Sequence, residues 1–428
     1  MKFKKADWIF NTDVYEVNLR QYSEEGSINA FLKELPRLKE MGVSTLWFMP
    51  ITPIAQKNKK GTLGSQYACS NYTAVSDEVG SIADFKIFVS QAHEMGFKVI
   101  IDWVANHTGW DHVWTISNPE YYKFDTDTCD FKKASGMDDI IELDYQNQEL
   151  RNAMIAAMRF WITEFDIDGF RCDLAFWVQL DFWIEARVEL EKTKTVFWLA
   201  ESDPIENPDY FQAFDACYTW RWMHQSASFY KDHRNKNMLD EVLMQYNQLD
   251  ADDNIFLWFT SNHDENTWNG TEYEKYGDAA KAFAVFSFTW NGVPLIYSGQ
   301  ELPNYKRLQF FDKDVIEWSN EYALHDFYKT LLALHKTNPA LRAADVMVCT
   351  FMLTNSAENE VMVYLRKNDN DEVLVLLNLS DQKINCVIND ERLGGKFIEI
   401  FSKAHFEFGS TAAFELAPWG YLVFEKAD

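Results

Sequence analysis

The sequence predicts an α/β protein in which a barrel of alternating strands and helices precedes a small antiparallel β domain. Eight short apolar, β-branched or aromatic runs alternate with longer helical patterns through the first three-quarters of the chain. After about residue 338 only strands and turns follow. Eight strands that are each followed by a helix favour a closed (β/α)8 TIM barrel. The rival, an open doubly wound sheet, requires a glycine-rich phosphate loop after its first strand, and NLRQYSEEGS at 18–27 is not one.

The eight barrel strands are predicted from their content of Val, Ile, Leu and aromatic residues. They span residues 14–21, 44–50, 98–103, 168–173, 195–200, 216–220, 255–260 and 293–298.

Three helical patterns between these strands are clear. Ser81 is the predicted N-cap of one helix, and Gly96 is the predicted residue after its C-cap. Pro36 predicts a kink or a second helical start within residues 28–42. The pattern at 147–166 places one apolar stripe on a helix face, made of Leu150, Met154, Met158, Trp161 and Phe165.

The domain organisation follows from this change of pattern. Residues 1–338 are expected to form the catalytic barrel, and residues 339–428 a C-terminal all-β domain. A short inserted subdomain is expected at about 104–145, after the third strand. It would lie at the C-terminal end of the strands, where such barrels carry their active sites.

Composition narrows the classes of partner. Forty Lys and Arg against 66 Asp and Glu give a net charge of −26, so neither nucleic acid nor an anionic membrane is expected to bind. No run of about 18 apolar residues and no apolar signal segment is visible, so we expect a soluble, cytoplasmic protein. The 16 Trp and 19 Tyr fit either a large aromatic core or a cleft that stacks sugar rings. Oligomeric state is not predicted.

Polar residues stand at the predicted ends of four strands. Each alone is more often a turn or cap residue, but a cluster at several strand ends is not expected of solvated side chains. Because these ends converge on one face of a barrel, the side chains should share a cleft. They are Asp102, Asn106, His107, Arg171, Asp173, Glu201, Asn262, His263 and Asp264.

Such a set of carboxylates suits the cleavage of a glycosidic bond. One carboxylate attacks the anomeric carbon while a second, protonated one donates to the leaving oxygen and later activates water. A metal-dependent barrel hydrolase is a weaker alternative. His107 and His263 lie on different strands, and no H-x-H motif or Cys/His cluster accompanies them.

Four carboxylates lie within residues 164–177, and only Asp173 is predicted to reach the cleft. Glu164 and Asp166 are expected to close the preceding helix in solvent, and Asp168 to be a turn residue at the entry of the strand. Arg171 lies two residues before Asp173 on the same strand face, so its guanidinium should keep that carboxylate ionised and oriented.

The segments DWVANH, GFRCD, LAE and NHD resemble the four signature regions of the alpha-amylase family of glycoside hydrolases, in the family's order and spacing. Residues 64–85, 295–301 and 310–318 are similar to that family as well, so the resemblance covers essentially the whole chain. It implies a family 13 type barrel and a retaining hydrolase of α-glucosidic bonds in maltooligosaccharides and other starch-derived α-glucans. That mechanism passes through a covalent glycosyl-enzyme intermediate.

By this resemblance Asp173 corresponds to the nucleophile, Glu201 to the general acid/base and Asp264 to the residue that stabilises the transition state. A catalytically silent binding relative, a remote alternative, would typically lack at least one of these carboxylates. An α-glucan transglycosidase or an α-1,6-acting glucosidase would use the same residues, so both alternatives stay open.

The resemblance also implies residues that bind substrate. His107 and His263 match histidines that hydrogen-bond the hydroxyls of the cleaved glucose, and Tyr67 matches the aromatic residue on which that ring stacks. Arg171 completes the expected binding set. Asn106 matches a residue that often contributes to a structural calcium site, whereas the chemistry itself is expected to need no cofactor.

Two positions depart from the family pattern. Many relatives carry a Lys and a His three and four residues after the nucleophile, where this chain has Phe176 and Trp177. Those side chains usually serve the aglycone subsites, and the His position lends its backbone carbonyl to calcium. The departure therefore weakens the expectation of a conventional starch-cleaving acceptor site and of bound calcium.

Overall fold

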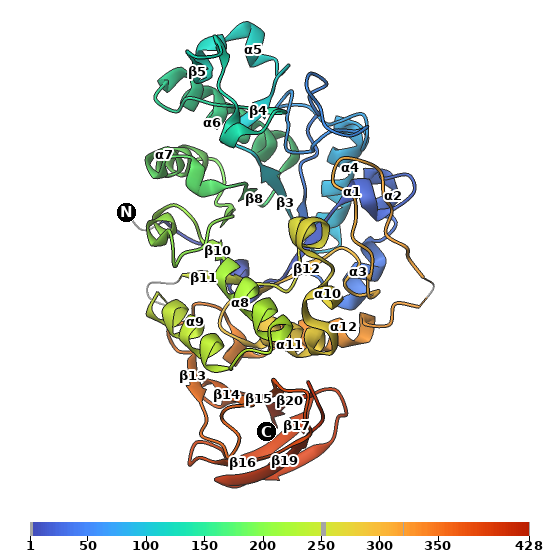
Figure 1. The fold of residues 1–428 in the computed structure, drawn as a ribbon, viewed down its shortest axis with the longest axis vertical. Helices are drawn as coiled ribbons and strands as arrows, with labels where there is room; N and C mark the ends of the chain where they lie inside the picture. The colour runs from blue at the N-terminus through green and yellow to red at the C-terminus, as the bar shows by residue number, and fades with distance from the viewer. Residues whose placement is uncertain (1–2, 250–253, 320, 428) are drawn as a thin grey trace.

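The barrel predicted from the sequence is present in the computed structural model, which describes residues 3–249, 254–319 and 321–427 (Figure 1). The strands are parallel, and the barrel closes because β1 pairs with both β2 and β12. Around the barrel the order is β1-β12-β11-β10-β9-β8-β3-β2. The eight described strands are β1 (Val14–Val17), β2 (Thr45–Phe48), β3 (Lys98–Trp103), β8 (Gly169–Cys172), β9 (Phe197–Ala200), β10 (Ala216–Tyr218), β11 (Ile255–Trp258) and β12 (Val293–Tyr297).

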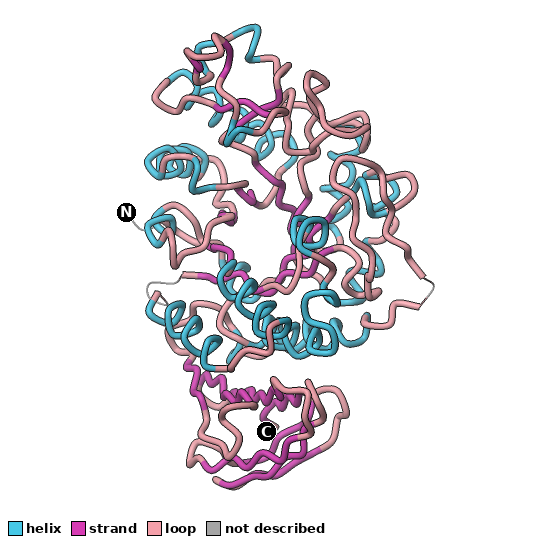
Figure 2. The backbone as a smooth tube through the Cα atoms, in the orientation of Figure 1, coloured by secondary structure: helices cyan, strands magenta, loops and turns pink. Residues whose placement is uncertain are grey.

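Helices surround the strands (Figure 2). Two details differ from the predicted alternation: the run at 14–21 leaves the strand after Val17 and turns into α1, and β9 is followed only by a 3-10 turn at Pro208–Gln212. Apart from α5 in the segment after β3, the described α-helices are α1 (Leu19–Tyr22), α2 (Ile28–Leu32), α3 (Leu35–Met41), α4 (Ile82–Glu94), α6 (Gln148–Phe165), α7 (Leu180–Leu190), α8 (Trp220–Lys231), α9 (Asn237–Gln248), α10 (Glu272–Tyr276), α11 (Ala280–Thr289) and α12 (His325–Thr337). Among the described residues, no helix combines the length and the apolar character needed to cross a membrane.

The predicted helix ends are confirmed. The Ser81 side chain accepts a hydrogen bond from the Asp84 amide and closes a capping box at the start of α4. Gly96 follows the C-cap of that helix with a φ of +82°, a conformation that glycine adopts without strain. Pro36 lies in the first turn of α3, so it marks a second helical start rather than a kink.

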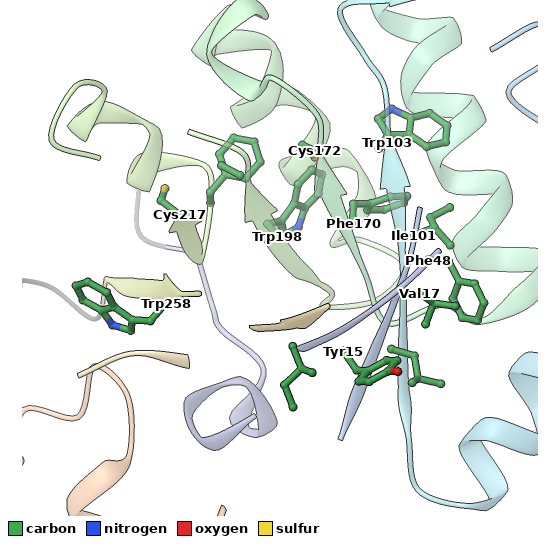
Figure 3. Close-up of a cluster of buried hydrophobic side chains, with 14 of the residues drawn as sticks. Tyr15, Val17, Phe48, Ile101, Trp103, Phe170, Cys172, Trp198, Cys217 and Trp258 are labelled. Carbon is green, nitrogen blue, oxygen red and sulfur yellow. The ribbon is translucent and has the colours of Figure 1, made fainter. Parts of the chain in front are cut away.

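Side chains of the barrel strands alternate between two cores. Those on the outer face, such as Phe48 and Trp103, pack under the helices (Figure 3), and those on the inner face, such as Trp47, fill the barrel. Gly169 faces inward, and a Cβ there would lie 2.3 Å from the carbonyl oxygen of Phe197. The barrel interior is therefore packed at the level of Gly169.

The segment after β3 forms a small separate layer at the top of Figure 1, in the region where the inserted subdomain was expected. The strands β4 and β7 pair antiparallel within it, as do β5 and β6. Its elements are β4 (His107–Gly109), α5 (Trp114–Ser117), β5 (Phe124–Asp125), β6 (Asp130–Phe131) and β7 (Ile140–Glu142). The division of the chain into residues 1–338 and 339–428 stays a proposal.

The C-terminal region consists of two antiparallel sheets, with strand order β13-β14-β15-β20-β17-β18 in one and β16-β19 in the other. One face of the larger sheet packs against the barrel, where the Tyr364 hydroxyl lies 2.6 Å from the Thr289 hydroxyl. These sheets confirm the C-terminal antiparallel β domain that the sequence predicts. The strands are β13 (Cys349–Met352), β14 (Val361–Asn368), β15 (Asp371–Asn378), β16 (Ile384–Asn389), β17 (Gly395–Glu399), β18 (His405–Phe408), β19 (Thr411–Leu416) and β20 (Tyr421–Lys426).

Candidate active site

The structure brings the sequence-predicted site residues together beyond the C-terminal ends of the barrel strands. Five of them line one cavity of about 420 Å³, which is in the usual range for a small-ligand site. Arg171 and His263 are buried beneath it. The five lining residues are Tyr67, His107, Asp173, Glu201 and Asp264.

Arg171 binds three carboxylates with one guanidinium. Its Nη1 donates to Asp102 Oδ1 at 3.1 Å and to Asp173 Oδ1 at 2.9 Å, and its Nη2 lies 3.0 Å from Glu201 Oε2. Burial alone would lower the pKa of Arg171, but Asp102 and Glu201 raise it well above its ordinary value. The group is therefore a permanent positive charge that fixes Asp173 and Glu201 relative to each other.

Burial dominates the protonation of these carboxylates. It raises the pKa of Glu201 to about 7, against the opposing effect of Arg171. It also raises the pKa of Asp173, where Arg171 again acts in the opposite direction. The expectation that Arg171 favours the ionised form of Asp173 therefore has the right sign, but burial is the larger effect. A carboxyl with a pKa near 7 can both donate and accept a proton at neutral pH.

The backbone beside Asp173 also binds Glu201. Leu174 adopts a left-handed conformation, with φ 39° and ψ 49°, which is strained for a residue with a Cβ. Its amide donates to Glu201 Oε2 at 2.8 Å. The sequence offered no signal for this contact, because the strain is visible only in the folded backbone.

His263 lies in a buried network that the sequence analysis did not identify. Its Nδ1 is 2.5 Å from Glu16 Oε1, and its Nε2 is 2.8 Å from the Tyr67 hydroxyl. That hydroxyl donates to Asp102 Oδ2 at 3.1 Å, and the Tyr67 ring stacks on the His263 ring with a centroid distance of 5.4 Å. Glu16 could have been found from its sequence, since a carboxylate inside the apolar run VYEV needs a buried partner.

Asp264 is the most accessible of the three predicted catalytic carboxylates. Its side chain is 37% exposed, and its Oδ2 lies 3.4 Å from His263 Nε2. It lines the cavity together with Asp173 and Glu201, so three carboxylates from three strand ends face one space.

His107 and Asn106 differ in what they can bind. Burial lowers the pKa of His107 to about 4, so a neutral imidazole lines the cavity. The Asn106 side-chain nitrogen lies 3.3 Å from His107 Nδ1, and the backbone carbonyl of Asn106 accepts from the Leu143 amide. Among the described residues no group of three or more His, Cys, Asp or Glu side chains is placed to hold a metal ion. The contribution of Asn106 to a structural calcium site stays a prediction.

A second cavity of about 580 Å³ adjoins the first and shares Leu174, Glu201 and Asp264 with it. Phe176 and Trp220 line it, and the Trp220 ring stacks on His224. Phe176, one of the two positions that depart from the family pattern, is thus an exposed aromatic residue beside the site. Trp177 is also exposed but is not part of the cavity lining.

Asp168 is not the turn residue that the sequence predicted. It is 3% exposed and accepts hydrogen bonds from His93 Nε2 at 2.7 Å and from the Val99 amide at 3.0 Å. The Lys98 and Lys194 ammonium groups lie 3.2 and 3.3 Å away. Asp168 is therefore the buried anion of an ion cluster at the strand entries, at the opposite end of the barrel from the site. Glu164 and Asp166 are exposed, as expected.

Comparisons with known proteins show to which family the sequence and the fold correspond. The family model "Alpha amylase, catalytic domain" matches residues 9–139 and 119–309, and "Maltogenic Amylase, C-terminal domain" matches residues 351–423. A crystal structure of a noncanonic maltogenic alpha-amylase, AmyB from Thermotoga neapolitana, superposes with a TM-score of 0.88 at 28% identity and covers 98% of this chain and 99% of that one.

Two curated relatives are longer than this chain. Alpha-amylase MalA of Haloarcula japonica is 27% identical over 398 residues, which is 88% of this chain and 56% of that protein. A cyclomaltodextrinase of a Bacillus species is 23% identical over 82% of this chain and 65% of its own length. The chain thus spans between half and two-thirds of these two relatives.

Proposed function

Because the chain belongs to the alpha-amylase family, we propose that it hydrolyses α-glucosidic bonds in maltooligosaccharides and related α-glucans. One observation carries the proposal: Asp173 and Glu201 are bound by a single buried guanidinium and face one cavity together with Asp264. This arrangement supplies a carboxylate to attack the anomeric carbon and a carboxylic acid to protonate the leaving oxygen.

The proposed reaction retains the anomeric configuration. Asp173 attacks the anomeric carbon while the bond to the leaving oxygen breaks, and Glu201 gives that oxygen its proton. The resulting glycosyl ester on Asp173 is then attacked by water, whose proton returns to Glu201. Asp264 stabilises the positive charge that develops on the ring in both steps. A raised pKa suits Glu201 for this double role, because the group must hold a proton first and lose it later.

Substrate binding is assigned to the side chains around these carboxylates. Tyr67 offers an aromatic face, and the neutral His107 offers a ring nitrogen to sugar hydroxyls. The ring nitrogens of the buried His263 already have partners in Glu16 and Tyr67, so His263 acts by positioning Tyr67. Aromatic faces and neutral donors are the groups that bind an uncharged sugar ring.

A second candidate function, transfer of the glycosyl group to another sugar, is favoured by one observation. Phe176 and Trp220 give the adjoining cavity apolar faces on which an acceptor sugar can stack. A sugar bound there would compete with water for the glycosyl ester on Asp173. Hydrolysis stays the leading proposal, because the second cavity is open enough for its residues to be reached by solvent: His224 within it is exposed.

The test measures product release from maltotriose by chromatography over time, with the Asp173→Asn variant beside the wild type. We expect turnover by the wild type, none by the variant, and the same circular dichroism and melting temperature within a few degrees. Asp166→Asn is the matched control, since Asp166 is exposed and remote from the cavity, and it should keep full activity. Turnover by Asp173→Asn would remove Asp173 as nucleophile. No product from any α-glucan with the wild type would favour a binding role.

A further inference from the structure

The two adjoining cavities differ in the catalytic carboxylates that they contain. Asp173 lines only the first cavity, whereas Glu201 lines both. If Asp173 is the nucleophile and Glu201 the acid, as proposed above, the ring that becomes bonded to Asp173 occupies the first cavity. The leaving sugar then occupies the second, and the scissile oxygen lies between them at Glu201. The first cavity therefore holds the part of the oligosaccharide that extends toward its non-reducing end.

An ion pair forms part of the wall of this first cavity. Lys60, from the loop after β2, places its Nζ 2.6 Å from Oδ1 of Asp139, which lies in the segment after β3. Both residues line the first cavity and neither lines the second. Asp139 is only 4% exposed, and its charge acts on the neighbouring His107. The pair thus joins two loops in the wall of the first cavity and takes no part in the wall of the second.

A third segment holds the Lys60 loop in place. The Thr62 amide and hydroxyl donate to Asp312 Oδ1 at 2.8 and 2.6 Å, and the Leu63 amide donates to the Phe311 carbonyl at 3.0 Å. Gly61, with a φ of +61°, fits only as glycine, since a Cβ there would lie 2.5 Å from Cβ of Phe311. The loop that carries Lys60 is therefore anchored and not free to swing aside.

We propose that Lys60 and Asp139 close the glycone end of the cleft and bind the hydroxyls of the terminal non-reducing glucose. The enzyme then acts from the non-reducing end of the oligosaccharide and releases products of one constant, short length. This inference rests on the proposed hydrolytic function and deepens it.

The free hydroxyl groups of a terminal glucose suit the Lys60–Asp139 ion pair. A terminal glucose has free hydroxyl groups, which can donate to the Asp139 carboxylate and accept from the Lys60 ammonium. An internal glucose carries a further sugar in place of one hydroxyl proton. That sugar would have to part the two charged groups and leave the buried Asp139 carboxylate without its cation. The site thus discriminates against an internal glucose, because its entry leaves a buried carboxylate without its cation.

The experiment compares two maltopentaoses that carry the same fluorophore at the reducing end. One has a free non-reducing glucose, and in the other that glucose bears a 4,6-O-ethylidene group. Chromatography of the fluorescent fragments gives both the rate of cleavage and the position of the cut. For the wild type we expect one constant cut position, and cleavage of the free-end substrate at least about tenfold faster than that of the blocked one.

Two variants separate end recognition from activity in general. Asp139→Asn and Lys60→Gln each remove one charge of the pair with little change of shape, and each should lower the preference for the free end by about tenfold. Asp138→Asn is the matched control. Asp138 pairs with Lys133 at 2.5 Å in solvent and does not line the cavity, so its removal should leave the preference unchanged.

The outcomes distinguish this inference from the function on which it rests. Equal cleavage of the free and blocked substrates by the wild type would overturn the inference and leave the hydrolytic function standing. An unchanged preference in both Asp139→Asn and Lys60→Gln would also overturn it, because the discrimination would then lie elsewhere. No cleavage of either substrate by the wild type would overturn the proposed function and the inference with it.

Discussion

Glu16 and His263 share a hydrogen bond of 2.5 Å although neither side chain reaches solvent. The Tyr67 hydroxyl donates to Asp102, which leaves the His263 Nε2 that lies 2.8 Å from that hydroxyl free to donate to it. Glu16 accepts from Nδ1, and both ring nitrogens of His263 therefore carry a proton. Burial alone would lower the pKa of His263, but Asp264 and Glu16 raise it to about 9. The site thus holds a second buried cation besides Arg171.

Replacing Glu16 by Gln should lower the pKa of His263 clearly below 9. The substitution keeps the shape of the side chain and removes one of the two anions that stabilise the imidazolium, while Asp264 stays and Arg171 continues to oppose it. A titration of histidine-labelled protein by NMR measures this pKa directly. His107, which is held near 4 by burial, is the internal control in the same spectra. An unmoved His263 titration would contradict the role assigned to Glu16.

Glu201→Gln should lose activity in a way that depends on the leaving group. A general acid contributes about 10²–10⁴-fold, so turnover of maltotriose should fall by about that factor. Maltosyl fluoride needs no protonation of its leaving group, and the variant should still form the glycosyl ester on Asp173 from it. Mass spectrometry should then show the variant carrying one maltosyl group. An equal loss of rate with both substrates would argue against Glu201 as the acid.

The same carboxylate should weaken the fold at high pH. Its pKa is about 7 in the folded protein and ordinary when unfolded, so the folded state binds more protons between these values. The free energy of unfolding therefore falls as pH rises through this interval. Glu201→Gln should raise the free energy of unfolding by about 1–3 kcal/mol at pH 8 and leave it nearly unchanged at pH 4. Denaturant unfolding at both pH values measures this, and equal effects would contradict the shifted pKa.

Asp168→Asn should destabilise the protein without changing its chemistry. Burial would raise the pKa of Asp168, but His93 and Lys194 lower it to about 2. Its stabilising contribution is present above its ordinary pKa of 3.8 and is lost as pH falls through about 2. We expect a loss of about 2–3 kcal/mol at pH 7, less than for a fully buried pair because the cations are partly exposed. Asp166→Asn, at an exposed neighbouring position, should cost less than about 1 kcal/mol.

The barrel and the meeting of the carboxylates could be predicted because both follow from local patterns. Short apolar runs between amphipathic segments indicate buried parallel strands, and the carboxyl ends of such strands converge on one face. Asp173 and Glu201 stand directly after strands, and Asp264 follows the end of β11 within a few residues, so their meeting could be predicted without knowledge of long-range contacts.

Other features depend on contacts that no local pattern contains. Asp168 precedes a glycine and matches a turn residue, but its partners His93 and Lys194 come from distant positions in the chain. The left-handed conformation of Leu174 is imposed by the hydrogen bonds around it rather than by its own propensity. The strand β18 is largely exposed and β19 half-exposed, and polar residues interrupt their apolar ones, so no apolar run predicts them.

The central claim is a retaining cleavage of α-glucosidic bonds by Asp173 and Glu201, and the anomeric form of the first product tests it most directly. Proton NMR recorded within the first turnovers of maltotriose resolves the α and β anomers before they equilibrate in water. Two successive displacements at the anomeric carbon predict that the α anomer appears first and the β anomer only later, by mutarotation. A freshly released β anomer would show a single displacement by water and would contradict Asp173 as nucleophile.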